Sequence, residues 1–91
     1  MIRLNVFIKV DEAKRADVLK AAVELTACSL KDRGCIAYDI FESATRKDVL
    51  MICETWQNEE DLDLHQKSSH FVSLVGKMQE LASLKIEKFQ F

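Results

Sequence analysis

Four segments in which apolar and polar residues alternate constrain this chain more than any other feature. They cover residues 2–10, 35–42, 49–56 and 84–91, and a period of two residues is typical of β-strands. Segments with helical spacing lie between the first and second strands and between the third and fourth. This order predicts an α+β fold of ferredoxin-like βαββαβ topology, with an antiparallel sheet and the helices on one face.

The helical segments have recognisable ends. Asp11 begins the first, and we expect Gly34 to end it, because glycine often follows the last helical turn. Asn58 is a good N-cap for a short helix with an acidic first turn, and Ser68 or Ser69 caps a longer one. The longer helix has apolar residues at spacings of three and four: Phe71, Leu74, Val75, Met78 and Leu81 or Ala82.

The chain of 91 residues has room for one domain, residues 1–91. Its formal net charge of −2 and the absence of a basic stripe argue against nucleic-acid binding. The longest apolar run, residues 49–53, is too short to span a membrane, so we expect a cytoplasmic protein with no membrane partner. Cys28, Cys35 and Cys53 are spaced unlike a disulfide framework and are interpreted as buried thiols.

Apolar residues occupy both faces of the predicted strands. Phe7 and Phe41 lie out of phase with their apolar neighbours, and Met51 and Cys53 alternate with other apolar residues. Helices would cover one face, so the other face needs a second cover. Two sheets packed face to face would provide it symmetrically, which predicts a homodimer. A monomer with scattered exposed apolar residues is the alternative.

Motifs for cofactors are absent from the sequence. With only two glycines, Gly34 and Gly76, the chain can form neither a dinucleotide-binding fingerprint nor a P-loop. His65 and His70 lie five residues apart across a predicted helix break, unlike the pair that binds zinc from one helical face. We therefore expect no cofactor and no metal.

Seven polar or aromatic residues among apolar neighbours are candidates for a functional site: Asn5, Tyr38, Glu54, Trp56, His65, His70 and Phe71. Glu54 and Trp56 share one strand face, and His65 leans towards the buried side of its helix. The dipole at the start of the longer helix favours a neutral His70 ring. Asparagine is unusual inside a strand, which favours a site role for Asn5. For the others, a paired structural role in the core remains open.

Three fragments of the sequence resemble the antibiotic biosynthesis monooxygenase family. They are G-C-x-x-Y at residues 34–38, E-x-W at residues 54–56, and H-x(4)-H-F at residues 65–71. The resemblance covers essentially the whole chain and implies a dimeric α/β barrel. It also implies that Asn5, Trp56 and His65 occupy pocket positions, with Glu54 and His70 at the other motif positions.

The family includes quinol and polyketide monooxygenases that use neither metal nor flavin, haem-degrading enzymes, and an isomerase of a phosphorylated diketone. The haem branch has a histidine ligand in its last helix, but no histidine follows Phe71 here. A phosphorylated substrate would require a cationic clamp, for which Arg3 or Lys9 would have to turn inward.

The resemblance thus implies a cofactor-independent monooxygenase that oxidises a quinol or polycyclic phenol in an apolar pocket under the second helical layer. His65 or His70 would help to deprotonate a hydroxyl, and Asn5 and Trp56 would orient the substrate. Glu54, Tyr38 and Phe71 would complete the binding site. The alternatives are an isomerase of a small diketone, in which Glu54 moves a proton, and a non-catalytic module that binds a small molecule.

Overall fold

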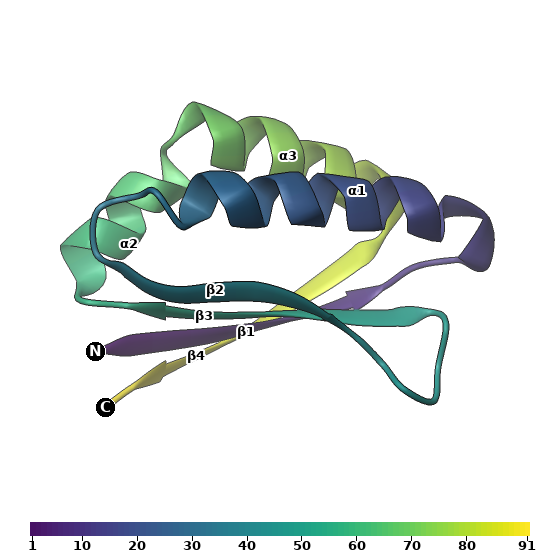
Figure 1. Ribbon diagram of the computed structural model, residues 1–91, viewed down its shortest axis with the longest axis horizontal. Helices are drawn as coiled ribbons and strands as arrows, with labels where there is room; N and C mark the ends of the chain where they lie inside the picture. The colour runs from purple at the N-terminus through teal and green to yellow at the C-terminus, as the bar shows by residue number, and fades with distance from the viewer.

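A computed structural model describes residues 1–91 and contains four strands and three helices. In chain order they are β1 (Ile2–Lys9), α1 (Glu12–Ser29), β2 (Cys35–Glu42), β3 (Val49–Trp56), α2 (Glu59–Gln66), α3 (Ser69–Leu81) and β4 (Ser83–Gln90). The strands form one antiparallel sheet in the order β2-β3-β1-β4. All three helices lie on one side of this sheet (Figure 1), so the predicted ferredoxin-like topology is confirmed.

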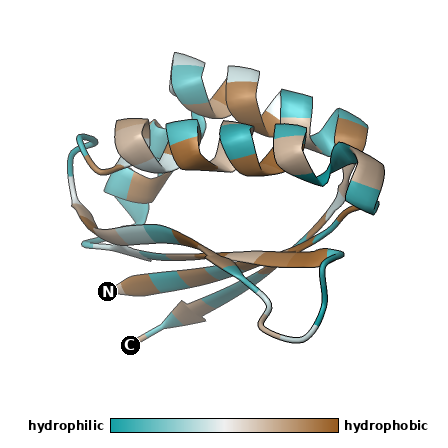
Figure 2. Ribbon diagram, turned by 45° about the vertical axis from the view of Figure 1, so that its right-hand side comes forward, coloured by the Kyte–Doolittle hydropathy of each residue, from teal (hydrophilic) through white to brown (hydrophobic).

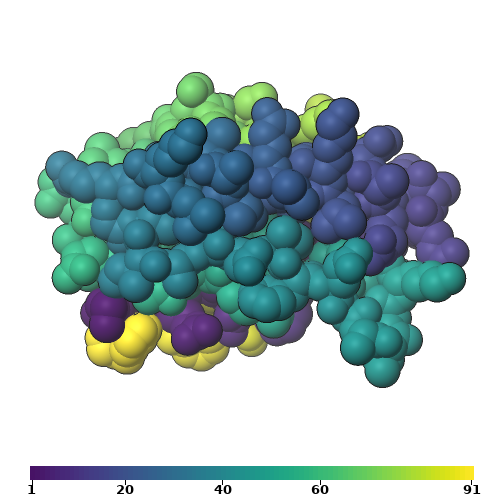
Figure 3. Space-filling model, viewed as in Figure 1, coloured from purple at the N-terminus to yellow at the C-terminus, as the bar shows by residue number.

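The core lies between the sheet and the helices. Strand β1 pairs with β3 along its whole length, from Ile2 opposite Trp56 to Lys9 opposite Val49. This register aligns the inward side chains of both strands beneath α1 and α3, where each fully buried aliphatic side chain contributes roughly 1.5–3 kcal/mol. Side chains close the space between the layers, and the connection between β2 and β3 projects from the body (Figure 3).

Capping residues mark the starts of α2 and α3. The Asn58 side chain accepts a hydrogen bond from the Asp61 backbone N–H at 2.8 Å, and the Ser68 hydroxyl accepts one from the Phe71 N–H at 3.3 Å. Both predicted caps are therefore confirmed. The Ser68 hydroxyl also donates to the His65 carbonyl at 2.6 Å. The break between these helices sets the end of α2 next to the start of α3.

The prediction that Gly34 ends the first helix is wrong. Helix α1 ends at Ser29, and Gly34 lies in the turn that leads into β2. Its φ of 77° is left-handed, and a Cβ atom at this position would overlap the Asp61 side chain. Glycine is therefore required where the turn and α2 approach each other. Arg33 reinforces the contact with an ion pair to Asp61 at 2.6 Å.

The sheet face turned away from the helices is uncovered in this chain, and exposed apolar side chains lie on it among polar ones. Phe7, Phe41 and Phe89 are 40–49% exposed there, and Met51 is half-buried. Hydrophobic residues occur on the strands as well as on the helices (Figure 2), and the exposure of Phe7, Phe41 and Phe89 confirms the predicted two-sided apolar pattern. The three cysteines are free and half-buried, not fully buried as expected. None of the helices has the length and apolar character needed to cross a membrane.

Candidate functional site

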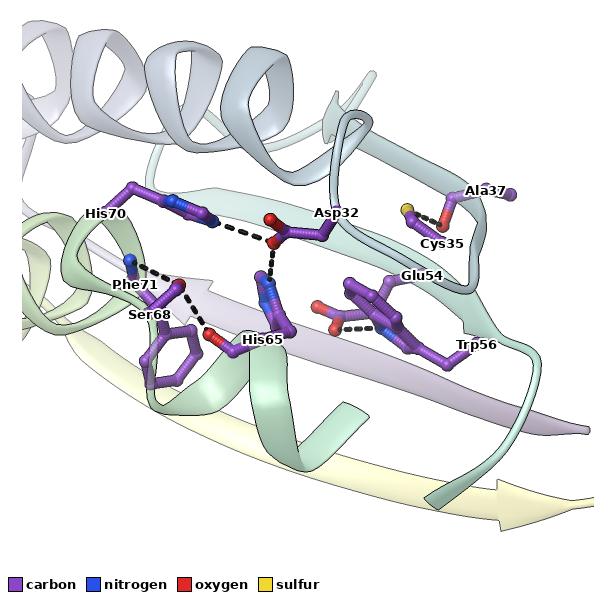
Figure 4. A network of polar contacts seen from close by, with 9 residues as sticks. All are labelled: Asp32, Cys35, Ala37, Glu54, Trp56, His65, Ser68, His70 and Phe71. Carbon is purple, nitrogen blue, oxygen red and sulfur yellow. Dashed lines mark hydrogen bonds and ion pairs between the residues drawn. The ribbon is translucent and has the colours of Figure 1, made fainter. Parts of the chain in front are cut away.

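Two histidines from different helices share one carboxylate oxygen. Asp32 follows α1, and its Oδ2 lies 2.8 Å from His65 Nδ1 and 2.7 Å from His70 Nε2 (Figure 4). His65 lies in the last turn of α2 and His70 in the first turn of α3. Because a carboxylate oxygen accepts hydrogen bonds, each of these imidazole nitrogens donates a hydrogen bond to Asp32. The helix break brings the two rings to the same group.

His65 presents an unpartnered nitrogen inside the protein. Its side chain is fully buried, and this burial lowers its pKa, although the hydrogen bond to Asp32 acts in the opposite direction. In the resulting neutral ring, Nδ1 carries the proton and Nε2 is an acceptor. Nε2 is buried and has no hydrogen-bond partner. Such an orphan costs about 1–3 kcal/mol, which a ligand that donates a hydrogen bond would recover.

Aromatic rings surround the His65 imidazole. Ring centroids lie 4.4 Å away for Trp56, 5.1 Å for Phe71 and 5.7 Å for Tyr38. Trp56 and Tyr38 are buried, whereas Phe71 is half-buried. The free nitrogen therefore has a water-poor, mostly apolar environment in which electrostatic interactions are strong.

Glu54 places a second titratable group in the same enclosure. Its Oε1 accepts a hydrogen bond from Trp56 Nε1 at 2.8 Å, and the residue is only 5% exposed. Burial raises the pKa of Glu54 to about 7, with the Trp56 hydrogen bond acting in the opposite direction. Tyr38 lies opposite Glu54 in the strand register, and burial raises the pKa of its phenol, which stays protonated. Near neutral pH, Glu54 can therefore either give or take a proton.

Six of the seven predicted site residues come together here, and Asn5 does not. Asn5 pairs with Cys53 on β3 and Glu87 on β4, and its place in the alternation turns it to the open sheet face with Phe7. Because successive side chains of β1 point to opposite faces, Asn5 and His65 lie on opposite sides of the sheet.

The open apolar pocket expected beside Trp56 and His65 is not present in this structure. Both side chains are fully buried, and neither lines any of the five main surface clefts. The space is filled by the aromatic rings themselves. One of these clefts is lined by Ala27, Cys28, Lys31, Asp32 and His70. It approaches the shared carboxylate from the side of α1.

Asp32 is the functional candidate that the sequence analysis missed. It lies 33 and 38 residues from its two partners, in a polar connection where aspartate is common, so no local signal identifies it. The ligand atoms of Asp32, His65 and His70 lie within 4.8 Å of one another. Two imidazoles and a carboxylate are also a set that can hold a transition metal. A bound ion would have to replace both hydrogen bonds to Asp32.

Comparisons with known proteins relate this arrangement to one family. The family model described as "Antibiotic biosynthesis monooxygenase" matches residues 1–77, which include Asp32, both histidines and the aromatic rings around them. "Putative monooxygenase YcnE" of Bacillus subtilis (strain 168) is 32% identical over 87 residues, which are 96% of this chain and 92% of that protein.

Solved structures agree with this match. A crystal structure from Bacteroides thetaiotaomicron VPI-5482, described as a "Possible Oxidoreductase", is 63% identical, with a TM-score of 0.98 over 99% of this chain and 96% of that one. A protein from Methanosarcina mazei Go1 is 25% identical, with a TM-score of 0.93 over 98% and 90% of the two chains. Both relatives align over nearly their full length.

Proposed function

Because this chain belongs to the antibiotic biosynthesis monooxygenase family, we propose that it oxidises a quinol or polycyclic phenol with molecular oxygen and without a cofactor. The observation that carries the proposal is the buried, unpartnered Nε2 of His65. A neutral imidazole that a carboxylate orients through its other nitrogen is a suitable general base. The rings of Trp56 and Phe71 offer stacking surfaces to an aromatic substrate.

The chemistry begins with a proton transfer. The substrate hydroxyl donates a hydrogen bond to His65 Nε2 and then gives up its proton, and Asp32 stabilises the imidazolium through the 2.8 Å contact with Nδ1. The resulting anion is electron-rich enough to reduce oxygen directly. A positioned base of this kind contributes typically about 10²–10⁴-fold to a rate.

The geometry favours His65 over His70 as the base. His70 uses Nε2 to donate to Asp32, and its side chain is 23% exposed, so it has neither a buried free acceptor nor an apolar environment. We assign His70 a positioning role, in which its hydrogen bond holds the Asp32 carboxylate in place for His65.

Substrate binding requires a movement of side chains, since rings fill the space beside His65. Phe71 is the half-buried member of the aromatic set, so its displacement exposes the least apolar surface to water. We expect a flat substrate to take over its contacts with the imidazole.

Two finer proposals concern the substrate and the assembly. An isomerase of a phosphorylated diketone is disfavoured, because Arg3 and Lys9 are exposed on the open sheet face, away from Glu54. The exposed apolar side chains of the open face support a homodimer in which a second copy covers them.

Oxygen uptake with a panel of quinols and anthrones tests the proposed function. We expect Asp32→Asn and His65→Gln to slow uptake by roughly 10²–10⁴-fold, while dialysis against a chelator leaves the wild-type rate unchanged. Asp63→Asn is the matched control, because Asp63 is exposed on α2 and pairs only with Lys67. Wild-type rates in both Asp32→Asn and His65→Gln would refute the proposal, and product formation without oxygen would indicate an isomerase. Tight binding of a quinol without product would indicate a binding module.

A further inference from the structure

Three side chains that can bind a metal ion come from separate parts of the chain and meet at one point. Asp32 Oδ2 lies 2.8 Å from His65 Nδ1 and 2.7 Å from His70 Nε2 (Figure 4), and the three ligand atoms lie within 4.8 Å of one another. The chain contains only these two histidines. Their spacing excludes a site on one helical face, and the helix break provides a site across two helices instead.

We infer that Asp32, His65 and His70 form a binding site for Zn²⁺, and that an ion bound there takes the proposed base out of use. The second part rests on the proposed function, in which His65 removes a proton from the substrate. Two imidazole nitrogens and one carboxylate oxygen suit Zn²⁺, whereas Mg²⁺ and Ca²⁺ require more oxygen ligands than this site provides.

The observed spacing needs only a small adjustment to accept the ion. Zinc bonds of about 2.0–2.1 Å in a tetrahedral arrangement place the ligand atoms about 3.3 Å apart. Each contact with Asp32 would therefore lengthen by roughly half an ångström. Asp32 and His70 can make this movement because their side chains are 21% and 23% exposed, while the fully buried His65 stays in place.

A surface cleft gives the ion access to two of its three ligands. The cleft is lined by Ala27, Cys28, Lys31, Asp32 and His70, and it leaves room for water as a fourth ligand, as in zinc sites with an open position. Lys31 is the one cationic side chain among the lining residues. It is exposed, so salt screens its repulsion of the ion. Because the ion must displace two hydrogen bonds, the site fills when Zn²⁺ is added and empties on dialysis against a chelator.

The unpartnered Nε2 of the buried His65 favours this exchange. Coordination through Nδ1 leaves the proton of the neutral ring on Nε2. Aromatic rings of Tyr38, Trp56 and Phe71 pack around the imidazole, and an aromatic face can accept a weak hydrogen bond from an N–H group. The ion thus replaces a bare acceptor with an N–H that these surroundings tolerate. The substrate hydroxyl then lacks the nitrogen that would take its proton.

Calorimetric titration of the full chain with ZnCl₂ tests the site. After dialysis against a chelator, wild type should bind one Zn²⁺ per chain. Loss of a ligand costs more than the roughly 10–100-fold typical of an outer-shell partner, so the Kd should rise by more than about 100-fold in Asp32→Asn and in His70→Gln. Asp63→Asn is the matched carboxylate control, since Asp63 is exposed and pairs only with Lys67. Cys28→Ser controls for the thiol in the cleft. Both controls should bind as wild type does.

Oxygen uptake with an anthrone as substrate tests the effect on the base. Added ZnCl₂ should stop uptake by wild type and by Asp63→Asn, with a half-maximal effect at the calorimetric Kd. Excess chelator should restore the original rate, because the ion leaves and His65 Nε2 becomes an acceptor again.

The possible results separate the two parts of the inference from the proposed function. Absence of zinc binding in wild type, or unchanged binding in both Asp32→Asn and His70→Gln, would overturn the site and leave the proposed function intact. Full uptake with the site saturated would overturn the effect on the base. Absence of uptake before zinc is added would refute the proposed function, while the titration would still decide the metal site.

Discussion

At the scale of single residues, burial of Glu54 makes the free energy of unfolding depend on pH. The folded protein holds this proton up to about pH 7, whereas the unfolded chain releases it near the usual value of about 4.3. A group whose pKa is raised in the folded state contributes stability at low pH that is lost as pH rises. The site thus retains a carboxyl group that destabilises the fold at neutral pH.

Replacing Glu54 with glutamine should therefore stabilise the protein under basic conditions. We expect the free energy of unfolding of Glu54→Gln, relative to wild type, to rise between about pH 4.5 and 7 and to level off above that, with a total change of roughly 3–4 kcal/mol. Urea denaturation at pH 4, 6 and 8 measures it, with Glu24→Gln as the control. A difference that does not change with pH would contradict the raised pKa.

Strand parity predicted the buried part of the site correctly but could not predict its polar centre. Glu54 and Trp56 share a face as expected, and the helical spacing from Leu62 turned His65 inward. Asp32 escaped prediction because its partners are distant in sequence and its own neighbours are polar. Asn5 was grouped with them on residue type, and the pleat of β1 puts it on the other face.

At the scale of elements, hydrophobic periodicity predicts the helices and strands but not the conformation of the turns between them. Strand and helix positions followed from hydrophobic spacing and caps, since these are local properties of the chain. The role of Gly34 depended on the approach of Asp61 from α2, a tertiary contact that local sequence does not reveal. Because the first helix was expected to extend to Gly34, the turn after Ser29 that carries Asp32 was not predicted.

The two glycines should respond to alanine with opposite signs. Gly34→Ala should destabilise the protein by roughly 1–3 kcal/mol, because it introduces a Cβ atom at a left-handed φ and against Asp61. Gly76→Ala should stabilise it by about 0.5–1 kcal/mol, since Gly76 lies inside α3 with nothing within 4 Å of the added atom. Chemical denaturation of both variants checks the prediction, which destabilisation by Gly76→Ala or no loss in Gly34→Ala would contradict.

At the scale of the whole molecule, the open sheet face is the proposed interface of a homodimer. We expect the wild-type chain to sediment with twice the mass of one subunit, and Phe7→Glu to sediment as a single subunit, because a charge on β1 would be buried in the proposed interface. Val23→Glu is the control, since Val23 is 53% exposed on α1, on the helical side. A monomeric wild type, or a dimeric Phe7→Glu, would contradict the proposed homodimer.

The two hydrogen bonds that Asp32 accepts from His65 and His70 couple the size of substrate that the site admits to the orientation of the proposed base. His65 lies at the end of α2 and His70 at the start of α3. Widening this junction to admit a larger substrate would therefore also weaken the hydrogen bonds with Asp32 that orient the proposed base. Under the proposed function, variants that accept larger substrates should therefore turn over more slowly, and the fastest variants should be the most selective.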